Sequence, residues 1–123
     1  MPSKKRISTL KLRLYAGDEI AMGPGKADLL EAIQETGSIT NAGKALGMSY
    51  RRTWLLVDTM NRCYRLPLVI TVKGGAQGGG AQVTGLGTQV LAAYRKLQAK
   101  TATAGRKELD FLESKMARPS LEK

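Results

Sequence analysis

Residues 37–55 read GSITNAGKALGMSYRRTWL, and this stretch predicts two helices joined by a tight turn. Ser38 and Ser49 occupy positions where a hydroxyl group caps the start of a helix. Gly47 supplies the left-handed residue that ends the first helix. Because the turn is short, the second helix leaves at a steep angle, and its first turn points out of the domain.

That exposed first turn carries Tyr50, Arg51 and Arg52, which are side chains suited to phosphates and base edges. The pattern therefore predicts a DNA-binding helix-turn-helix. The alternative is an ordinary helical hairpin inside a core, which two arginines at the tip disfavour. Leu55 lies on the outer face, where it can contact a thymine methyl group. Trp54 lies near the boundary, and we expect it to be wholly or partly in the core.

The charge balance points to the same kind of partner. The chain of 123 residues has a net charge of +10, and between Glu35 and Glu108 eleven lysines and arginines face a single acid, Asp58. Such a block favours a polyanion, either nucleic acid or an anionic membrane surface, whereas solubilising charge normally mixes both signs. No apolar run approaches membrane-spanning length and residues 1–6 lack a signal peptide, so we expect a cytoplasmic protein without a membrane partner.

The residue inventory argues against catalysis. Histidine is absent and Cys63 is the only cysteine, which excludes His-dependent nucleophiles, most zinc sites and an intrachain disulfide. Cys63 falls on an apolar helical face, so we interpret it as a small buried residue. No carboxylate pair stands out for acid–base chemistry. The sequence predicts a protein that is not an enzyme and has no metal site.

The segment before residue 37 predicts a strand pair followed by a helix. Residues 1–6 are expected to be a basic disordered tail. Residues 7–16 alternate between apolar and polar side chains, which favours a half-buried strand over a helix, and residues 20–22 are a short return strand. A helix over residues 26–35 follows, stopped by a glycine. The GPGK run at 23–26 lacks the spacing of a phosphate-binding P-loop.

A hairpin is predicted directly after the second helix of the helix-turn-helix. That helix runs from Tyr50 to about Leu66, where Pro67 ends it. A β-branched strand over 68–72 and a returning strand over 82–84 enclose a glycine-rich loop. This order of elements is typical of a winged helix, with the hairpin as the wing.

The wing loop contains little that can pack against a core. Lys73 flanks it, and we expect Gly75, Gln77 and Gly79 to contact phosphates or enter a minor groove, because glycine lets backbone N–H groups approach closely. The alternative is a loop that is flexible and nothing more.

A long helix closes the chain. Thr84 caps it, it reaches at least Ala104, and Gly105 breaks or bends it. Its apolar seam is too long for so small a domain to cover, which predicts a homodimer; the seam residues are Val90, Leu91, Tyr94 and Leu97. The expected organisation is a winged helix-turn-helix domain over 7–84, a dimerisation helix over 85–117 and a frayed tail over 118–123.

Five segments carry a family resemblance: residues 25–33, 37–39, 48–54, 60–61 and 74–84. They resemble the N-terminal DNA-binding domain of molybdate-responsive ModE-type regulators, which is related to the winged helix of LysR-type regulators. The likeness covers nearly all of residues 7–100. It implies a helix-turn-helix inserted into the major groove and dimers formed through the N-terminal and long C-terminal helical regions.

Carried over by residue, the resemblance implies that Ser49, Tyr50, Arg51 and Arg52 face DNA and that residues 74–80 form the wing tip. Full-length family members carry a molybdate-binding region of small β-barrel modules after this domain, and nothing after the helix corresponds to it before Lys123. The resemblance therefore supports DNA binding, while molybdate remains a ligand by family analogy only.

These observations predict a mostly α protein with a small β component (α+β), a winged helix-turn-helix with an N-terminal β-hairpin and a long C-terminal helix. We expect a bacterial, nucleoid-associated homodimer that binds double-stranded DNA as a sequence-specific repressor without a cofactor. The expected DNA contacts are Ser38, Thr40, Ser49, Tyr50, Arg51, Arg52, Leu55, Lys73, Gly75, Gln77 and Gly79. One alternative is a molybdate-linked repressor whose oxyanion sensor lies in a partner or at another site. The other is a non-specific architectural protein.

Overall fold

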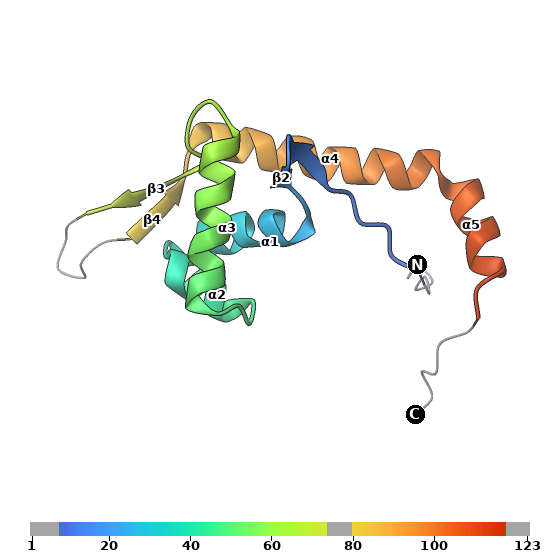
Figure 1. The fold of residues 1–123 in the computed structure, drawn as a ribbon, viewed down its shortest axis with the longest axis horizontal. Coiled ribbons are helices and arrows are strands. Elements are labelled where there is room, and N and C mark those ends of the chain that lie inside the picture. The colour runs from blue at the N-terminus through green and yellow to red at the C-terminus, as the bar shows by residue number, and fades with distance from the viewer. Residues whose placement is uncertain (1–7, 74–79, 118–123) are drawn as a thin grey trace.

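The computed structural model describes residues 8–73 and 80–117. Its elements in chain order are β1 (Leu14–Ala16), β2 (Glu19–Met22), α1 (Pro24–Thr36), α2 (Ile39–Ala45), α3 (Tyr50–Cys63), β3 (Val69–Val72), β4 (Gly80–Val83), α4 (Gly85–Ala104) and α5 (Arg106–Ser114). In Figure 1, α1, α2 and α3 form a body with the β3–β4 hairpin at one side. α4 runs along this body and continues beyond it as an arm that ends in α5. The predicted α+β winged helix-turn-helix is confirmed.

The hydrophobic core surrounds α1. Leu29, Leu30 and Ile33 of this helix are fully buried, and Met22 from β2 and Met60 from α3 pack with them. Burial of these side chains is the main stabilising contribution to a domain of this size. Because α3 turns its apolar face to this core, its opposite face stays at the surface.

α1 is two residues longer at its start and one longer at its end than the sequence predicts. Pro24 takes the first helical position, where its missing N–H leaves no hydrogen bond unmade. The helix ends at Gly37, which has the left-handed φ of 68°. Gly23 precedes the helix and provides no side-chain cap, so the first N–H groups of α1 have no capping hydroxyl or carboxylate.

Both serine caps and the glycine turn of the helix-turn-helix are confirmed. The Ser38 hydroxyl accepts a hydrogen bond from the Asn41 N–H at 3.0 Å, and the Ser49 hydroxyl accepts one from the Arg52 N–H at 3.1 Å. Gly47, in the turn, has a φ of 72°. These local bonds fix where α2 and α3 begin.

A close contact between α2 and α3 sets the angle of the helix-turn-helix. A Cβ atom at Gly43 would overlap the side chain of Thr53, so only glycine allows the two helices to approach this closely. The Thr53 hydroxyl donates to the Ser49 carbonyl oxygen at 2.8 Å, which keeps it from being an unsatisfied buried polar group.

The wing is an antiparallel hairpin in which Val69 pairs with Val83 and Val72 with Gly80. Its strands start and end within one or two residues of the predicted bounds. The Ala81 N–H donates to the Gly37 carbonyl oxygen at 2.9 Å and so joins β4 to the turn between α1 and α2. The wing therefore has a fixed position beside the helix-turn-helix.

The prediction that α3 continues to Leu66 is wrong, because the helix ends at Cys63. The Asn61 side chain explains the early end. Its Oδ1 accepts hydrogen bonds from the N–H groups of Leu68 (2.8 Å) and Val69 (3.1 Å), and its Nδ2 donates to the Val69 carbonyl oxygen at 2.9 Å. The chain must leave the helix early to bring these groups back to Asn61.

The prediction of a half-buried strand over residues 7–16 is also wrong in most of its length. Of the described residues 8–16, only Leu14–Ala16 form a strand, because β2 is four residues long and offers no partner to the residues before Leu14. Residues 8–13 are extended and pass beside α4, where the Tyr94 hydroxyl donates to the Leu12 carbonyl oxygen at 2.7 Å. Leu12 packs against the core, but Leu10 and Leu14 are 44% and 52% exposed, so the expected leucine face is only partly buried within one chain.

The long helix begins at the Thr84 cap and is interrupted at Gly105, as predicted. The sequence predicts a seam too long for one domain to cover, but two of its four residues, Leu91 and Tyr94, are buried in the core of the same chain. Both belong to the core cluster that includes the buried residues of α1, and the segment before β1 also contacts Tyr94 through the hydrogen bond to Leu12. Val90 is half-buried and Leu97 is 47% exposed, so these two residues remain accessible.

Candidate nucleic-acid interface

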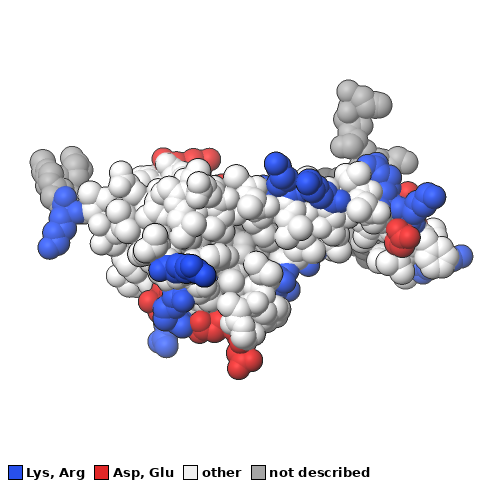
Figure 2. Space-filling model, turned by 90° about the horizontal axis from the view of Figure 1, so that it is seen from above, with Lys and Arg blue, Asp and Glu red and all other residues white. Residues whose placement is uncertain are grey.

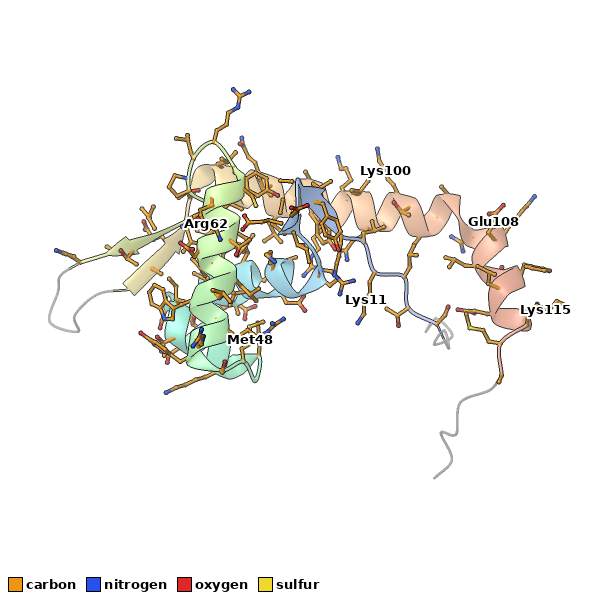
Figure 3. The ribbon with its side chains drawn as sticks, in the orientation of Figure 1. Lys11, Met48, Arg62, Lys100, Glu108 and Lys115 are labelled. Atoms are coloured by element: carbon orange, nitrogen blue, oxygen red, sulfur yellow. The ribbon has the colours of Figure 1, made fainter. Side chains whose placement is uncertain are left out.

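The first turn of α3 presents three large side chains to solvent. Tyr50 is 67% exposed, and Arg51 and Arg52 are exposed beside it. Within the described part of the chain, neither guanidinium group has a salt-bridge or hydrogen-bond partner. Figure 3 shows this end of α3 at the lower tip of the body, next to the turn at Met48. Two unpaired cations at a projecting helix end can bind phosphates or guanine edges.

Two other arginines are paired with carboxylates of the same chain. Arg62, at the other end of α3, binds both carboxylate oxygens of Glu19 at 2.7 and 2.8 Å and one oxygen of Asp58 at 3.2 Å. Hydrogen bonds to Glu19 and then Asp58 raise the pKa of Arg62. Arg95 of α4 likewise binds Glu31 at 3.0 Å, together with Asp28 of α1. These two cations join elements of the fold rather than face a ligand.

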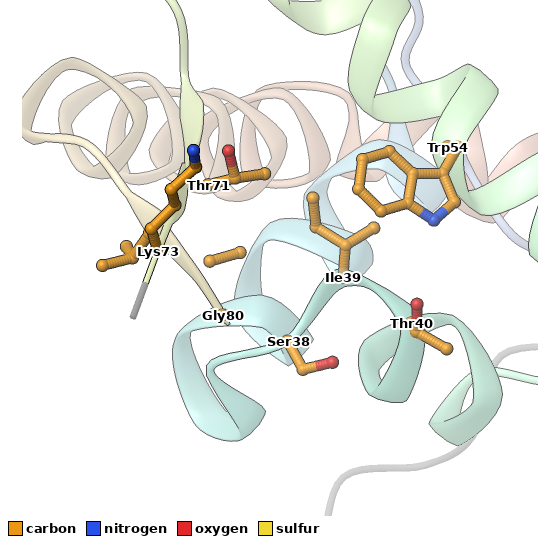
Figure 4. A pocket seen from close by; sticks show the side chains of 9 residues that line it. Ser38, Ile39, Thr40, Trp54, Thr71, Lys73 and Gly80 are labelled. Atoms are coloured by element: carbon orange, nitrogen blue, oxygen red, sulfur yellow. The ribbon is translucent and has the colours of Figure 1, made fainter. Parts of the chain in front are cut away.

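A concave surface lies between α2, α3 and the wing (Figure 4). Ser38 and Thr40 line it from the start of α2, and Thr71 and Lys73 line it from the wing side. The Trp54 ring forms another part of its wall. The structure therefore brings three predicted contact residues, Ser38, Thr40 and Lys73, to one groove beside α3.

Trp54 contributes to this surface although the sequence predicts a wholly or partly buried residue. Its side chain is 36% exposed, and its ring centroid lies 6.1 Å from that of Tyr50. An aromatic pair at the edge of a basic surface can contact sugars or thymine methyl groups. Helical spacing in α3 places Trp54 at the boundary of the buried face. It contains no information about the wing, which completes the groove around the Trp54 ring.

The remaining predicted contacts have different outcomes. Ser49 is exposed and is used as the helix cap, and Leu55 is 56% exposed on the outer face of α3, as predicted. Gly75, Gln77 and Gly79 lie outside the described residues.

A second basic surface was missed by the sequence analysis. Four cationic side chains line a cleft on the flank of α3 that faces away from Trp54; they are Lys11, Arg13, Lys26 and Arg52. Only Arg52 among them is a predicted contact residue. The GPGK run at 23–26 was a usable signal, since it places a lysine in the uncapped first turn of a helix.

Other kinds of site find no support in the part of the chain that the structure describes. No cluster of three or more cysteine and acidic side chains has an arrangement that could hold a metal ion. Among residues 8–73 and 80–117, no helix combines the length and apolar character needed to cross a membrane. Cys63 is half-buried, and burial, followed by the nearby Glu19 carboxylate, raises the pKa of its thiol. A raised pKa disfavours the reactive thiolate.

Curated relatives share the resemblance that the sequence predicts. The chain is 43% identical over 84 residues to the molybdenum transport protein ModE of Azotobacter vinelandii, covering 68% of this chain and 31% of that protein. It is 41% identical over 81 residues to the molybdenum-pterin-binding protein MopB of Rhodobacter capsulatus, covering 66% and 30%. It is 38% identical over 106 residues to the transcriptional regulator ModE of Yersinia pestis, covering 85% and 36%.

The predicted resemblance to ModE-type regulators is therefore confirmed, and several of the curated relatives, the Yersinia pestis protein among them, are named transcriptional regulators. No protein-family model matches the chain. The chain spans about a third of the length of the curated relatives it matches.

Proposed function

We propose that this chain, which resembles ModE-type regulators, is a DNA-binding transcriptional regulator that inserts the first turn of α3 into the major groove. The observation that carries the proposal is the pair of exposed, unpaired guanidinium groups of Arg51 and Arg52 at a projecting helix end. A helix of this kind reads base edges with its first residues, while neighbouring elements contact the backbone. Several relatives are named transcriptional regulators, and we propose no enzymatic activity.

The concave surface between α2, α3 and the wing supports a binding mode with contacts on both sides of α3. Lys73 and Ser38 line this surface, and in the proposed mode they would contact a phosphate on the wing side of the helix. Such contacts position the protein, whereas side chains of α3 select the sequence. We propose that the protein acts in the bacterial cytoplasm on chromosomal DNA.

Footprinting across promoter regions that neighbour the gene tests sequence specificity. The proposal expects protection of one site and an affinity that falls steeply as the salt concentration rises. Each phosphate contact should contribute about −0.9 to the slope of log affinity against log salt. Uniform coverage of all DNA would instead support the architectural alternative. Absence of binding to any duplex would overturn both.

We further propose that the protein binds DNA as a homodimer. An apolar groove lies between β1 and α4 and is lined by Leu14, Val90 and Leu97, of which Leu14 and Leu97 are about half exposed. Figure 2, seen from above, shows that much of this side of the molecule carries neither acidic nor basic side chains. A second copy would bury these apolar side chains and place two α3 helices on successive major-groove half-sites.

Sedimentation equilibrium at micromolar concentration tests the dimer. The expected mass is about twice the 13.3 kDa of one chain. Leu97→Glu should shift the protein toward monomer, because it would place a charge in the apolar groove, while Lys100→Glu on the same helix should not. A monomeric wild-type protein would contradict the dimer but not DNA binding.

Molybdate-linked repression is the second candidate, favoured by the names of the relatives, which include a molybdenum transport protein and a molybdenum-pterin-binding protein. It predicts that molybdate, and not sulfate, changes operator affinity. Promoter-reporter activity with and without the protein separates repression from activation.

A further inference from the structure

The cleft missed by the sequence analysis gathers positive charge from three separate segments. Lys11 and Arg13 come from the extended segment before β1, Lys26 from the first turn of α1, and Arg52 from α3. Figure 3 labels Lys11 on that extended segment. No acidic side chain is among the lining residues of this cleft. Four cations around one small cleft repel each other, so an anion bound there would relieve a cost that the folded protein otherwise bears.

The start of α1 contributes backbone donors to the same cleft. Gly25 and Lys26 occupy the second and third helical positions after Pro24, and Gly23 supplies no side-chain cap for their N–H groups. The first intrahelical bond is made one residue later, from the Ala27 N–H to the Gly23 carbonyl oxygen at 2.9 Å. Uncapped N–H groups and the positive end of a helix dipole favour a bound anion.

Lys26 is the observation that turns this helix start into a candidate site. Its side chain lines the cleft, yet the residue is only 7% exposed. Within the described residues its ammonium group has no hydrogen-bond or ion-pair partner. Both carboxylate oxygens of nearby Glu19 instead accept hydrogen bonds from Nη1 of Arg62.

Burial of most of the Lys26 side chain is unfavourable for its charged ammonium group, which has no hydrogen-bond or ion-pair partner among the described residues. Burial lowers the pKa of Lys26, the charges of Arg52 and Arg13 lower it too, and Cys63 and Glu19 oppose the change. Among the described residues, every fully buried side-chain nitrogen or oxygen has a hydrogen-bond partner. The ammonium group of Lys26 has none, so it is not fully buried and keeps contact with solvent. Lys26 lines the cleft, so the ammonium group reaches solvent there. A tetrahedral oxyanion there would pair with Lys26 and with the free N–H groups of α1.

Arg13 contacts the start of α1 through the aliphatic part of its side chain. Its Cγ lies 3.4 Å from the position that a Cβ atom would take at Gly23, so its side chain packs against the start of α1. Arg52 belongs both to this cleft and to the exposed first turn of α3. The cleft therefore adjoins the surface that would enter the major groove, where the nearest anion is a phosphate of the flanking strand.

We infer that the cleft at the start of α1 binds one backbone phosphate of the DNA, on the side of α3 away from the wing. The inference rests on the proposed function and adds a specific anchor to it. It means that the extended segment before β1 has a role in DNA binding through Lys11 and Arg13, besides packing against α4.

Lys26→Met is the central variant, because methionine keeps the apolar length of the side chain and removes the charge. Lys100→Met on α4 is the matched control, with the same change in net charge at an exposed position outside the cleft. For Lys26→Met we expect urea unfolding as resistant as wild type or more so, duplex affinity roughly tenfold lower, and a salt slope smaller by about 0.9. The loss should be equal for specific and non-specific duplexes. Arg13→Gln should give the same pattern without touching a buried residue.

The outcomes separate the two proposals. If wild type binds DNA but Lys26→Met and Arg13→Gln match Lys100→Met, the cleft assignment is overturned and the proposed function stands. If wild type binds no duplex, the proposed function fails, and the cleft assignment fails with it.

Amide resonances of Gly25 and Lys26 distinguish a backbone phosphate from a free oxyanion. We expect both resonances to shift on addition of a short duplex and to shift far less with inorganic phosphate, sulfate or molybdate at matched ionic strength. Saturation by a free oxyanion at micromolar concentration would overturn the backbone assignment and make the cleft a small-anion site.

Discussion

The two ends of α3 differ in how their polar side chains are used. At the first turn, Arg51 and Arg52 are exposed and have no partners among the described residues. At the last turn, Arg62 is bound to Glu19 and Asp58, and Asn61 makes three hydrogen bonds to the backbone near β3. One end of the helix is anchored to the fold, and the other is left available to a ligand.

A count of positive charges therefore does not locate a nucleic-acid interface. Arg51 and Arg62 belong to the same helix and are both exposed, but only Arg62 has carboxylates within reach. An exposed ion pair contributes little to stability and has a weaker net field than a free cation. The residues that matter for DNA are therefore the cations that the fold leaves unpaired.

The largest effect is expected at the anchored end. Asn61→Ala should lower the free energy of unfolding by about 3 kcal/mol, because it removes three hydrogen bonds and leaves partly buried backbone groups at Leu68 and Val69 unsatisfied. Urea unfolding measures the change. Asn41→Ala, on the exposed face of α2, is the control and should stay near wild type. A loss for Asn61→Ala no larger than for Asn41→Ala would mean that the wing is not held by α3.

The next effect belongs to the free end. Arg51→Ala and Arg52→Ala should each weaken operator binding by ~1–3 kcal/mol, the value of one good bidentate contact to a base edge, with little change in stability. Binding titrations at fixed salt measure this effect. A variant that loses affinity for the operator alone contacts bases, and one that loses it for all duplexes contacts phosphates. If both variants bind as wild type does, α3 is not the recognition helix.

The sequence predicts the free end well because its signals are local. Ser49, Gly47 and the arginines act within one or two helical turns, so periodicity and capping rules place them correctly. The anchored end depends on contacts between distant segments. Asn61 reaches the backbone at Leu68 and Val69, and no spacing rule gives this bond.

The same limit explains the errors elsewhere. The strand expected over residues 7–16 is shortened because its partner β2 ends at Met22, and alternation in one segment contains no information about its partner's length. Tyr94 is buried in the core cluster that includes residues of α1, and it also contacts the segment before β1 through the hydrogen bond to Leu12. The cationic cleft joins Arg13, Lys26 and Arg52, which are far apart in the sequence. Each of these features depends on tertiary packing.

A smaller effect is expected at the cap that joins the free end to the turn. Ser49→Ala removes the hydroxyl that accepts from the Arg52 N–H at 3.1 Å, and it should lower the free energy of unfolding by ~1 kcal/mol. Ser49→Asp preserves the cap and should keep the stability, but it places a negative charge beside Arg51 and Arg52. We therefore expect Ser49→Asp to weaken DNA binding more than Ser49→Ala does, measured by titration beside urea unfolding. The reverse order would indicate that the first turn of α3 does not approach the DNA.

The smallest effect is expected for Arg62→Ala, which tests the comparison between the two ends most directly. It makes the same change in net charge as Arg51→Ala and lies on the same helix, but its guanidinium group is already bound to Glu19 and Asp58. Duplex affinity and its salt slope should stay close to wild type, because Arg62→Ala removes contacts to two carboxylates and no contact to a phosphate. A loss equal to that of Arg51→Ala would show that total charge, and not pairing within the fold, determines the interface. Glu19→Gln completes the test: it frees one side of Arg62 and should leave affinity unchanged or slightly raised, since the released cation lies at the end of α3 far from the tip.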